Sequence, residues 1–183
     1  MKLKNHHNGY GIITLVIHWL MAVMIFGLFA LGLWMTDLTY YDPWYREAPA
    51  LHKSIGIVLL GLLAFRLFWR VINIKPQPLA SHSTAEKMIA AWVHKLLYML
   101  PFLVIVSGYM ISTADGRPVS VFELFEIPAI TTNIDNQEDV AGDIHFYLAW
   151  GLIGMAGLHA GAAIKHHVWE KDNTLKRMLG FAD

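Results

Sequence analysis

Four long apolar segments, separated by polar connections, dominate the pattern along the chain. They cover residues 12–35, 54–74, 90–111 and 144–164. A helix needs roughly 20 predominantly apolar residues to cross the hydrocarbon core of a bilayer. The first segment is too long for the apolar core of a signal peptide, and no small-residue cleavage site follows it, so we interpret it as a retained helix. The pattern predicts an all-α fold: an integral membrane four-helix bundle, formed by residues 1–183 as a single domain.

The basic residues predict the orientation of the four spans. Eleven Lys and Arg residues fall in or beside the segments on one side of the predicted membrane, and only Arg46, Lys53 and Arg117 fall on the other. Cytoplasmic loops carry the excess of Lys and Arg, so both termini are predicted to be cytoplasmic. With the acidic residues included, the outer segments have a net charge of −7 and the inner segments +7.

The composition narrows the functional class. Apolar residues make up 56% of the chain and charged residues 15%, whereas a soluble domain has about 45–50% and about 25%. These values exclude a disordered chain and a soluble nucleic-acid binder, and indicate membrane lipid as the surroundings. The chain contains no cysteine, which excludes thiolate-held iron–sulfur clusters, covalent c-type haem and thiol catalysis.

Histidines inside or beside the spans are the candidate functional residues, because ionisable side chains in a membrane are costly and usually functional. From a rise of about 1.5 Å per residue, His18 and His159 lie about 9 Å and about 8 Å from the cytoplasmic ends of their segments. His52 and His145 lie within about 5 Å of the outer ends. The four histidines therefore form two pairs of matched depth. His94 has about the same depth as His18 and is an alternative partner for His159.

The spacing on the last span favours two metalloporphyrin sites. His145 and His159 are separated by 14 residues, which is about 3.9 turns and about 21 Å, so both project from nearly the same face of one helix. Two stacked sites with two imidazoles each suit two haems. A haem iron with two histidine ligands has no open coordination position, which favours electron transfer over oxygen binding. Structural histidines that bond to a neighbouring helix are the plain alternative. A zinc site needs ligands converging at one point, and a proton relay needs carboxylates within the spans.

Several short motifs in this order resemble the prokaryotic cytochrome b561 family, which is related to the cytochrome b subunits of membrane formate dehydrogenases and nickel–iron hydrogenases. The motifs are Ile17-His18-Trp19-Leu20, His52-Lys53-Ser54-Ile55-Gly56, Asp143-Ile144-His145, Gly157-Leu158-His159 and Lys165-His166-His167 with the tail 171–178. The resemblance extends over all four segments. It implies a four-helix bundle in the bacterial inner membrane with two b-type haems, each held by two histidines.

The resemblance also implies the ligand pairs and the reaction. The cytoplasmic haem would have His18 and His159 as metal ligands, and the outer haem His52 and His145. Electrons would pass between the membrane quinone pool, with ubiquinone as a candidate, and a periplasmic or membrane redox partner. Some relatives oxidise superoxide and pass the electrons to ubiquinone, so an oxidoreductase activity of this kind is a second hypothesis. The net negative outer face argues against electrostatic steering of superoxide.

Other residues and roles follow less directly from the sequence. Lys53, beside a predicted ligand at the outer face, and Arg66, near the cytoplasmic end of its span, are candidate partners for haem propionates. Snorkelling to lipid phosphates is the alternative for Arg66. His166 is interpreted as a solvated residue at the inner interface, and His82 as a residue of a cytoplasmic segment without a role. A third functional hypothesis is a haem-bearing anchor for a larger redox complex, and a homodimer is one option for the assembly.

Overall fold

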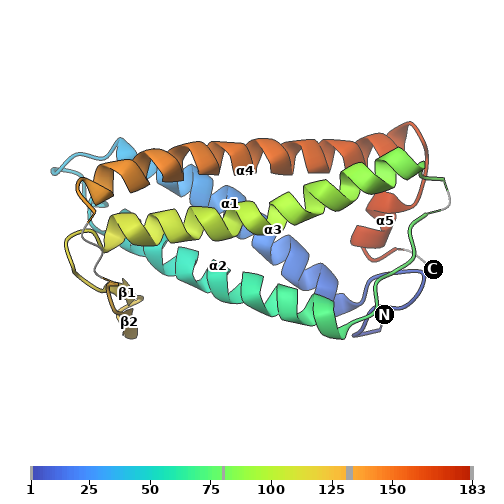
Figure 1. Cartoon of the computed structure of the whole chain (residues 1–183), viewed down its shortest axis with the longest axis horizontal. Coiled ribbons are helices and arrows are strands. Elements are labelled where there is room, and N and C mark those ends of the chain that lie inside the picture. The colour runs from blue at the N-terminus through green and yellow to red at the C-terminus, as the bar shows by residue number, and fades with distance from the viewer. Residues whose placement is uncertain (1, 80, 131–133, 182–183) are drawn as a thin grey trace. The chain divides into compact units, whose positions relative to one another are not determined.

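Four long helices dominate the computed structural model, which describes residues 2–79, 81–130 and 134–181 (Figure 1). The elements are α1 (Ile12–Thr36), α2 (Glu47–Ile72), α3 (Thr84–Ser112), β1 (Val119–Val121), β2 (Phe125–Ile127), α4 (Gln137–Val168) and α5 (Thr174–Met178). Helices α1 to α4 are each long and apolar enough to cross a membrane. The prediction of four spans is therefore confirmed.

Three helices begin six or seven residues before the apolar segments that predicted them, namely α2, α3 and α4. The added turns are polar, and polar residues contribute nothing to an apolar pattern. At the start of α3, Ser83 and Glu86 form a capping box. The Ser83 N–H and hydroxyl donate to the Glu86 carboxylate at 2.8 Å each, and the Glu86 N–H donates to the Ser83 hydroxyl oxygen at 3.2 Å. The cap supplies hydrogen-bond partners for backbone N–H groups in the first turn of α3, and lipid could not supply them.

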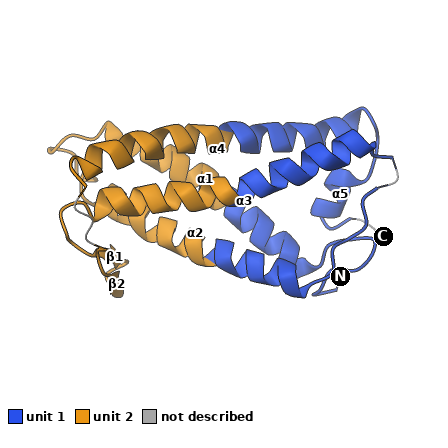
Figure 2. Cartoon of the chain, viewed as in Figure 1, with its two compact units in different colours: residues 1–22, 62–98, 154–183 blue, residues 23–61, 99–153 orange. Residues whose placement is uncertain are grey.

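The chain forms two compact units, shown in different colours in Figure 2. Unit 1 comprises Met1–Ala22, Leu62–Tyr98 and Gly154–Asp183, and unit 2 comprises Val23–Gly61 and Met99–Ile153. Each long helix contributes one part to unit 1 and the other to unit 2. Both ends of the chain belong to unit 1, in agreement with the prediction that the termini lie on the same side of the membrane.

Unit 1 has a small apolar core in which Leu15, Ile17, Met21 and Leu63 are buried. The segment before α1 is fixed by Asn5, whose side-chain oxygen accepts the Gly11 N–H at 2.9 Å and the Thr14 hydroxyl at 2.7 Å. A Cβ at position 11 would lie 2.3 Å from the Leu3 carbonyl oxygen, so only glycine fits there. The N-terminal segment is thus packed closely against the start of the helix.

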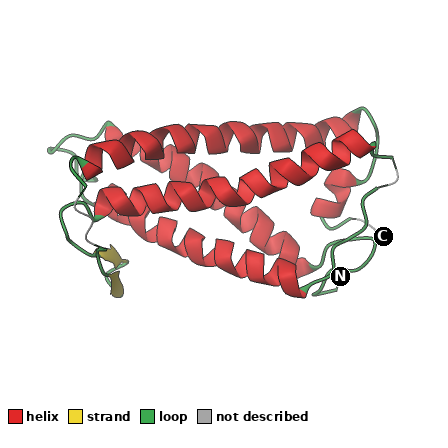
Figure 3. Ribbon diagram, viewed as in Figure 1, coloured by secondary structure: helices red, strands yellow, loops and turns green. Residues whose placement is uncertain are grey.

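A short β-hairpin in unit 2 was not predicted from the sequence (Figure 3). Strands β1 and β2 pair antiparallel, with Val119 opposite Ile127. The turn places Phe122 and Glu123 at positive φ, 49° and 60°, whereas hairpin turns usually signal this conformation with Gly or Asn. The hairpin is fixed to α2, because the Phe122 N–H donates to the Ser54 hydroxyl at 3.0 Å. The rest of the predicted outer segment, 114–143, includes residues 131–133, which lie outside the described residues.

Candidate functional site

In unit 2, two of the predicted ligands face each other across a cavity. His52 on α2 and His145 on α4 have ring centres 6.2 Å apart, with their planes at 68°. Both residues are partly buried. They line a cavity of about 380 Å³ whose other walls are largely apolar, including Ile57, Leu152 and Ile153. A flat apolar molecule with a central metal suits these walls.

The hydrogen bonds of His145 leave one ring nitrogen available as a ligand. Its Nδ1–H donates to the Val104 carbonyl oxygen at 2.9 Å, and the Ser107 hydroxyl oxygen lies 3.3 Å from the same nitrogen. Metal-binding histidines usually donate their second ring N–H to such an acceptor, which fixes the tautomer and the ring orientation. The lone pair of His145 therefore belongs to Nε2. On His52, the buried Nδ1 has no hydrogen-bond partner among the described residues.

Two glycines make room for the imidazoles of unit 2. A Cβ at Gly108 on α3 would lie 3.0 Å from His145 Cε1 and 3.2 Å from His145 Nδ1. A Cβ at Gly32 on α1 would lie 3.2 Å from His52 Cε1. Each ring thus packs directly against helix backbone, where a larger residue would displace it. Sequence reasoning assigned neither glycine a role, because glycine is common in membrane helices.

Gly108→Ala should weaken cofactor binding in unit 2. The added methyl group presses on the His145 ring and disturbs its bond to Val104, and over-packing of this kind costs about 1–3 kcal/mol. We expect about tenfold weaker affinity for the haem that the sequence predicts here, measured by haem titration of the cofactor-free protein. Gly61→Ala is the matched control, since a Cβ there meets nothing within 4 Å. Equal affinities for the two variants would contradict the packing argument.

In unit 1, three histidines come together instead of two. The ring centre of His159 on α4 lies 6.3 Å from that of His18 on α1, and 5.2 Å from that of His94 on α3. His18 and His159 are partly buried, whereas His94 is exposed. Both residues that the sequence offered as partners of His159, His18 and His94, therefore lie beside it, but their ring centres are at different distances from its own.

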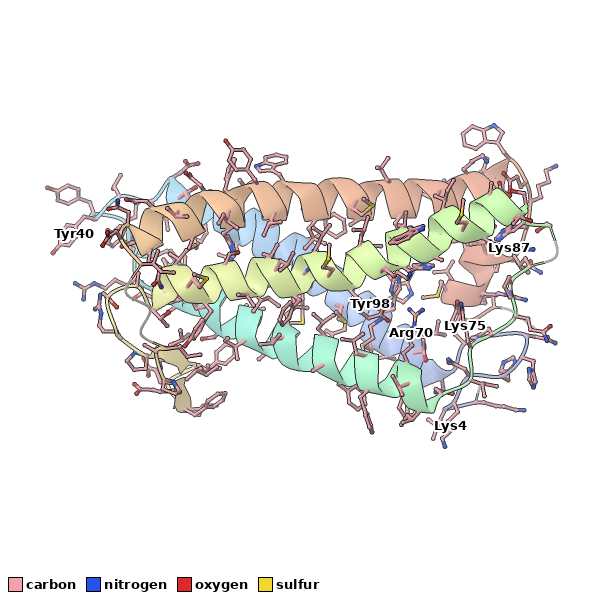
Figure 4. All side chains as sticks on the ribbon, viewed as in Figure 1. Lys4, Tyr40, Arg70, Lys75, Lys87 and Tyr98 are labelled. Carbon is pink, nitrogen blue, oxygen red and sulfur yellow. The ribbon has the colours of Figure 1, made fainter. Side chains whose placement is uncertain are left out.

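Arg66 contacts the predicted ligand His18. Its Nη2 lies 3.1 Å from His18 Nδ1, and its Nε–H donates to the Tyr98 hydroxyl at 3.1 Å. The guanidinium carbon of Arg70 lies 5.4 Å from the centre of the same Tyr98 ring, and both residues are labelled in Figure 4. The two arginines thus concentrate positive charge around one tyrosine in unit 1. Sequence reasoning missed Tyr98, because a tyrosine in an apolar helix carries no distinctive signal.

The separations of the rings test whether a haem iron fits between them. Two imidazoles that bind one iron end-on at about 2.0 Å have ring centres about 6.2 Å apart, because each centre lies about 1.1 Å behind its nitrogen. The pairs His52/His145 and His18/His159, at 6.2 and 6.3 Å, fit this requirement. The 5.2 Å between His94 and His159 is too short. The ring separations of these two pairs therefore fit iron held by two histidines.

Comparison with known proteins identifies the family. A sequence profile described as prokaryotic cytochrome b561 matches residues 9–181. This chain belongs to the prokaryotic cytochrome b561 family. It is a b-type cytochrome of the bacterial inner membrane with several spans, and membership in the cytochrome b561 family implies haem b.

Individual relatives agree with the family assignment. The chain is 49% identical over 180 residues to "Cytochrome b561 homolog 2" of Escherichia coli strain K12, covering 98% of this chain and 96% of the relative. It is 29% identical over 174 residues to "Probable superoxide oxidase CybB" of Yersinia pestis, covering 94% and 97%. It is 26% identical over 130 residues to "Cytochrome b561 homolog 1" of Escherichia coli K12, covering 70% and 72%.

The predicted propionate partners of this cytochrome b561 lie beside the proposed ligands. Lys53 lines the same cavity as His52 and His145, together with Arg117. Arg117 already pairs with Asp115, and hydrogen bonds from its side chain lower the pKa of that carboxyl. Lys53 is therefore the better placed of the two cations to meet an anionic group in the cavity.

Proposed function

We propose that this chain is a di-haem cytochrome that transfers electrons between the membrane quinone pool and a periplasmic or membrane redox partner. The observation that carries the proposal is the pair of imidazole separations, 6.3 Å in unit 1 and 6.2 Å in unit 2, each of which would let two histidines hold one iron. In this proposal residues 1–183 are one transmembrane domain with one haem b in each unit.

Four histidines hold the two irons, His18 with His159 and His52 with His145. A haem with two histidine ligands accepts and donates single electrons and leaves no coordination position open for a substrate. Lys53 would supply positive charge to the propionates of a haem in the cavity of unit 2, and Arg66, which contacts His18, would supply positive charge beside the haem of unit 1. The Nδ1–H bond of His145 to Val104 holds its ring in the ligating tautomer.

The exchange partners follow from the surroundings of the two haems. Ubiquinone is the proposed lipid-soluble carrier, since the protein spans the membrane in which the quinone pool resides. The outer segments have a net charge of −7, which suits a periplasmic redox protein with a positive docking face. The inner segments, with +7, would repel such a partner.

Haem quantitation and spectroscopy test the proposal on the detergent-purified protein. We expect two b haems per chain, low-spin in both oxidation states and unreactive to carbon monoxide, because no coordination position is open. In liposomes that contain ubiquinol, the haems should become reduced without an added partner. One haem per chain would mean that one of the two proposed histidine pairs does not bind haem. A well-folded preparation that was supplied with haem and still contained none would contradict both sites.

Oxidation of superoxide is the second candidate function, and the relative named a probable superoxide oxidase favours it. Lys53 offers a positive charge at the cavity wall of unit 2, although the outer segments as a whole are negative. The test is pulsed generation of superoxide with haem reduction followed in time. Reduction at a near diffusion-limited rate would support this candidate. Slow reduction, similar to that of a Lys53→Gln variant, would leave only the quinone-linked function.

A further inference from the structure

Three chain segments of unit 1 bring metal-binding side chains together outside the haem sites. His82 lies between α2 and α3, His166 lies in the last turn of α4, and Asp172 lies between α4 and α5. His82 Nε2 is 2.8 Å from Asp172 Oδ2, and His166 Nδ1 is 3.4 Å from the same oxygen. The two imidazole rings have centres 4.6 Å apart. The Oδ2 atom of Asp172 therefore lies close to one ring nitrogen of each histidine.

The cluster is neither solvated nor loosely held, in contrast to the interpretation of its histidines from sequence. The side chains of His82, His166 and Asp172 are only 17%, 14% and 7% exposed. The second oxygen of Asp172 accepts the Thr174 N–H at 2.8 Å, which orients the carboxylate.

The charges around the cluster suit a divalent cation. Glu170 Oε2 lies 2.5 Å from His166 Nδ1, and Glu86 can share a metal with these two residues. Lys165 neutralises one carboxylate through its 2.6 Å contact with Glu170. Three carboxylates, those of Asp172, Glu170 and Glu86, thus lie close to the two imidazoles. The C-terminal end of α4, which carries His166, also favours a cation.

We propose that His82, His166 and Asp172 form a zinc site, with Glu170 or water as the fourth ligand. Imidazole nitrogen and carboxylate oxygen are common zinc ligands, and ligand atoms around a tetrahedral zinc ion are about 3.3 Å apart. The observed separations of 2.8 and 3.4 Å lie close to that value, so small rotations of the side chains complete the site. The Thr174 N–H bond orients the carboxylate from outside the site, as outer partners of metal ligands do.

Zinc at this site would join three segments that are separate in sequence. The ligands come from the connection before α3, the end of α4 and the connection before α5. A bound ion stabilises the folded state by mass action, so the connections of unit 1 would become more resistant to heat and protease when zinc is present. The site is independent of the haem proposal, because none of its ligands is a proposed iron ligand.

Zinc binding to the haem-loaded protein, purified without a polyhistidine tag, tests the site. Competition with a chromophoric chelator should give one zinc ion per chain for the unaltered protein. His82→Gln and Asp172→Asn should each weaken zinc affinity by at least about 100-fold. His7→Gln, which changes an exposed histidine of the same unit, should bind like the unaltered protein. Equal affinities for all four proteins, or no binding to the unaltered one, would overturn the proposal.

X-ray absorption at the zinc edge keeps the test independent of whether the variants fold. For the unaltered protein with one equivalent of zinc, we expect scattering from two imidazoles and from oxygen ligands at about 2.0 Å. A spectrum with oxygen ligands alone, or with more than two imidazoles, would overturn the assignment. The haem content, measured on the same samples, should not change with zinc.

Discussion

His145→Ala is expected to leave the protein with one b haem per chain instead of two. The substitution removes one of the two ligands proposed for unit 2, whose residues include no histidine besides His52 and His145. The remaining haem should stay low-spin, since both ligands proposed for unit 1 are intact. Haem quantitation and the reduced-minus-oxidised spectrum measure this outcome, with about half of the absorbance lost.

A histidine on the same helix provides the control for this experiment. His167 belongs to α4 but to neither proposed pair, so His167→Ala should retain two haems. Full haem occupancy in the His145→Ala protein would contradict the assignment of unit 2. A loss of both haems that is accompanied by loss of the helical circular dichroism signal would instead indicate unfolding. In that case His145→Met, whose thioether sulfur can still bind iron, would be tested in its place.

The second large effect separates His18 from His94. His18→Ala should remove the haem of unit 1, because the 6.3 Å separation from His159 fits an iron between the rings. His94→Ala should keep it, since His94 is exposed and its ring centre is only 5.2 Å from that of His159. The two variants remove the same side chain from the same unit, so each controls for the other.

The measurement is the haem count with the low-spin fraction from electron paramagnetic resonance. We expect one haem per chain in His18→Ala and two in His94→Ala. The reverse result would mean that His94 is the partner of His159 and that the ring separations rearrange on haem binding. A high-spin signal in His18→Ala would show that the haem stays bound through one histidine only.

The spans could be predicted from sequence because a membrane requires long, nearly continuous apolar segments, and these are visible without an alignment. Their polar ends could not be predicted. The first turns of α2 and α4, which begin at Glu47 and Gln137, read as loop in a hydropathy pattern. The hairpin was missed because its turn uses Phe122 and Glu123 at positive φ in place of glycine.

The candidate site was predicted in part, for a physical reason. Helical rise fixes the depth of each histidine, and depth alone groups His18 with His159 and His52 with His145. Depth does not distinguish His18 from His94; the family resemblance implies His18, and the ring separations support that proposal. The packing of Gly32 against His52, and the meeting of His82 with Asp172, depend on residues far apart in sequence, so no local pattern reveals them.

The acceptor of the His145 Nδ1–H is a main-chain carbonyl, and a carbonyl draws the proton less strongly than a carboxylate does. An imidazole held in this way donates less electron density to a bound iron, and it therefore stabilises the ferric state less. The haem b proposed for unit 2 should consequently have a higher reduction potential than a haem whose ligand is backed by a carboxylate.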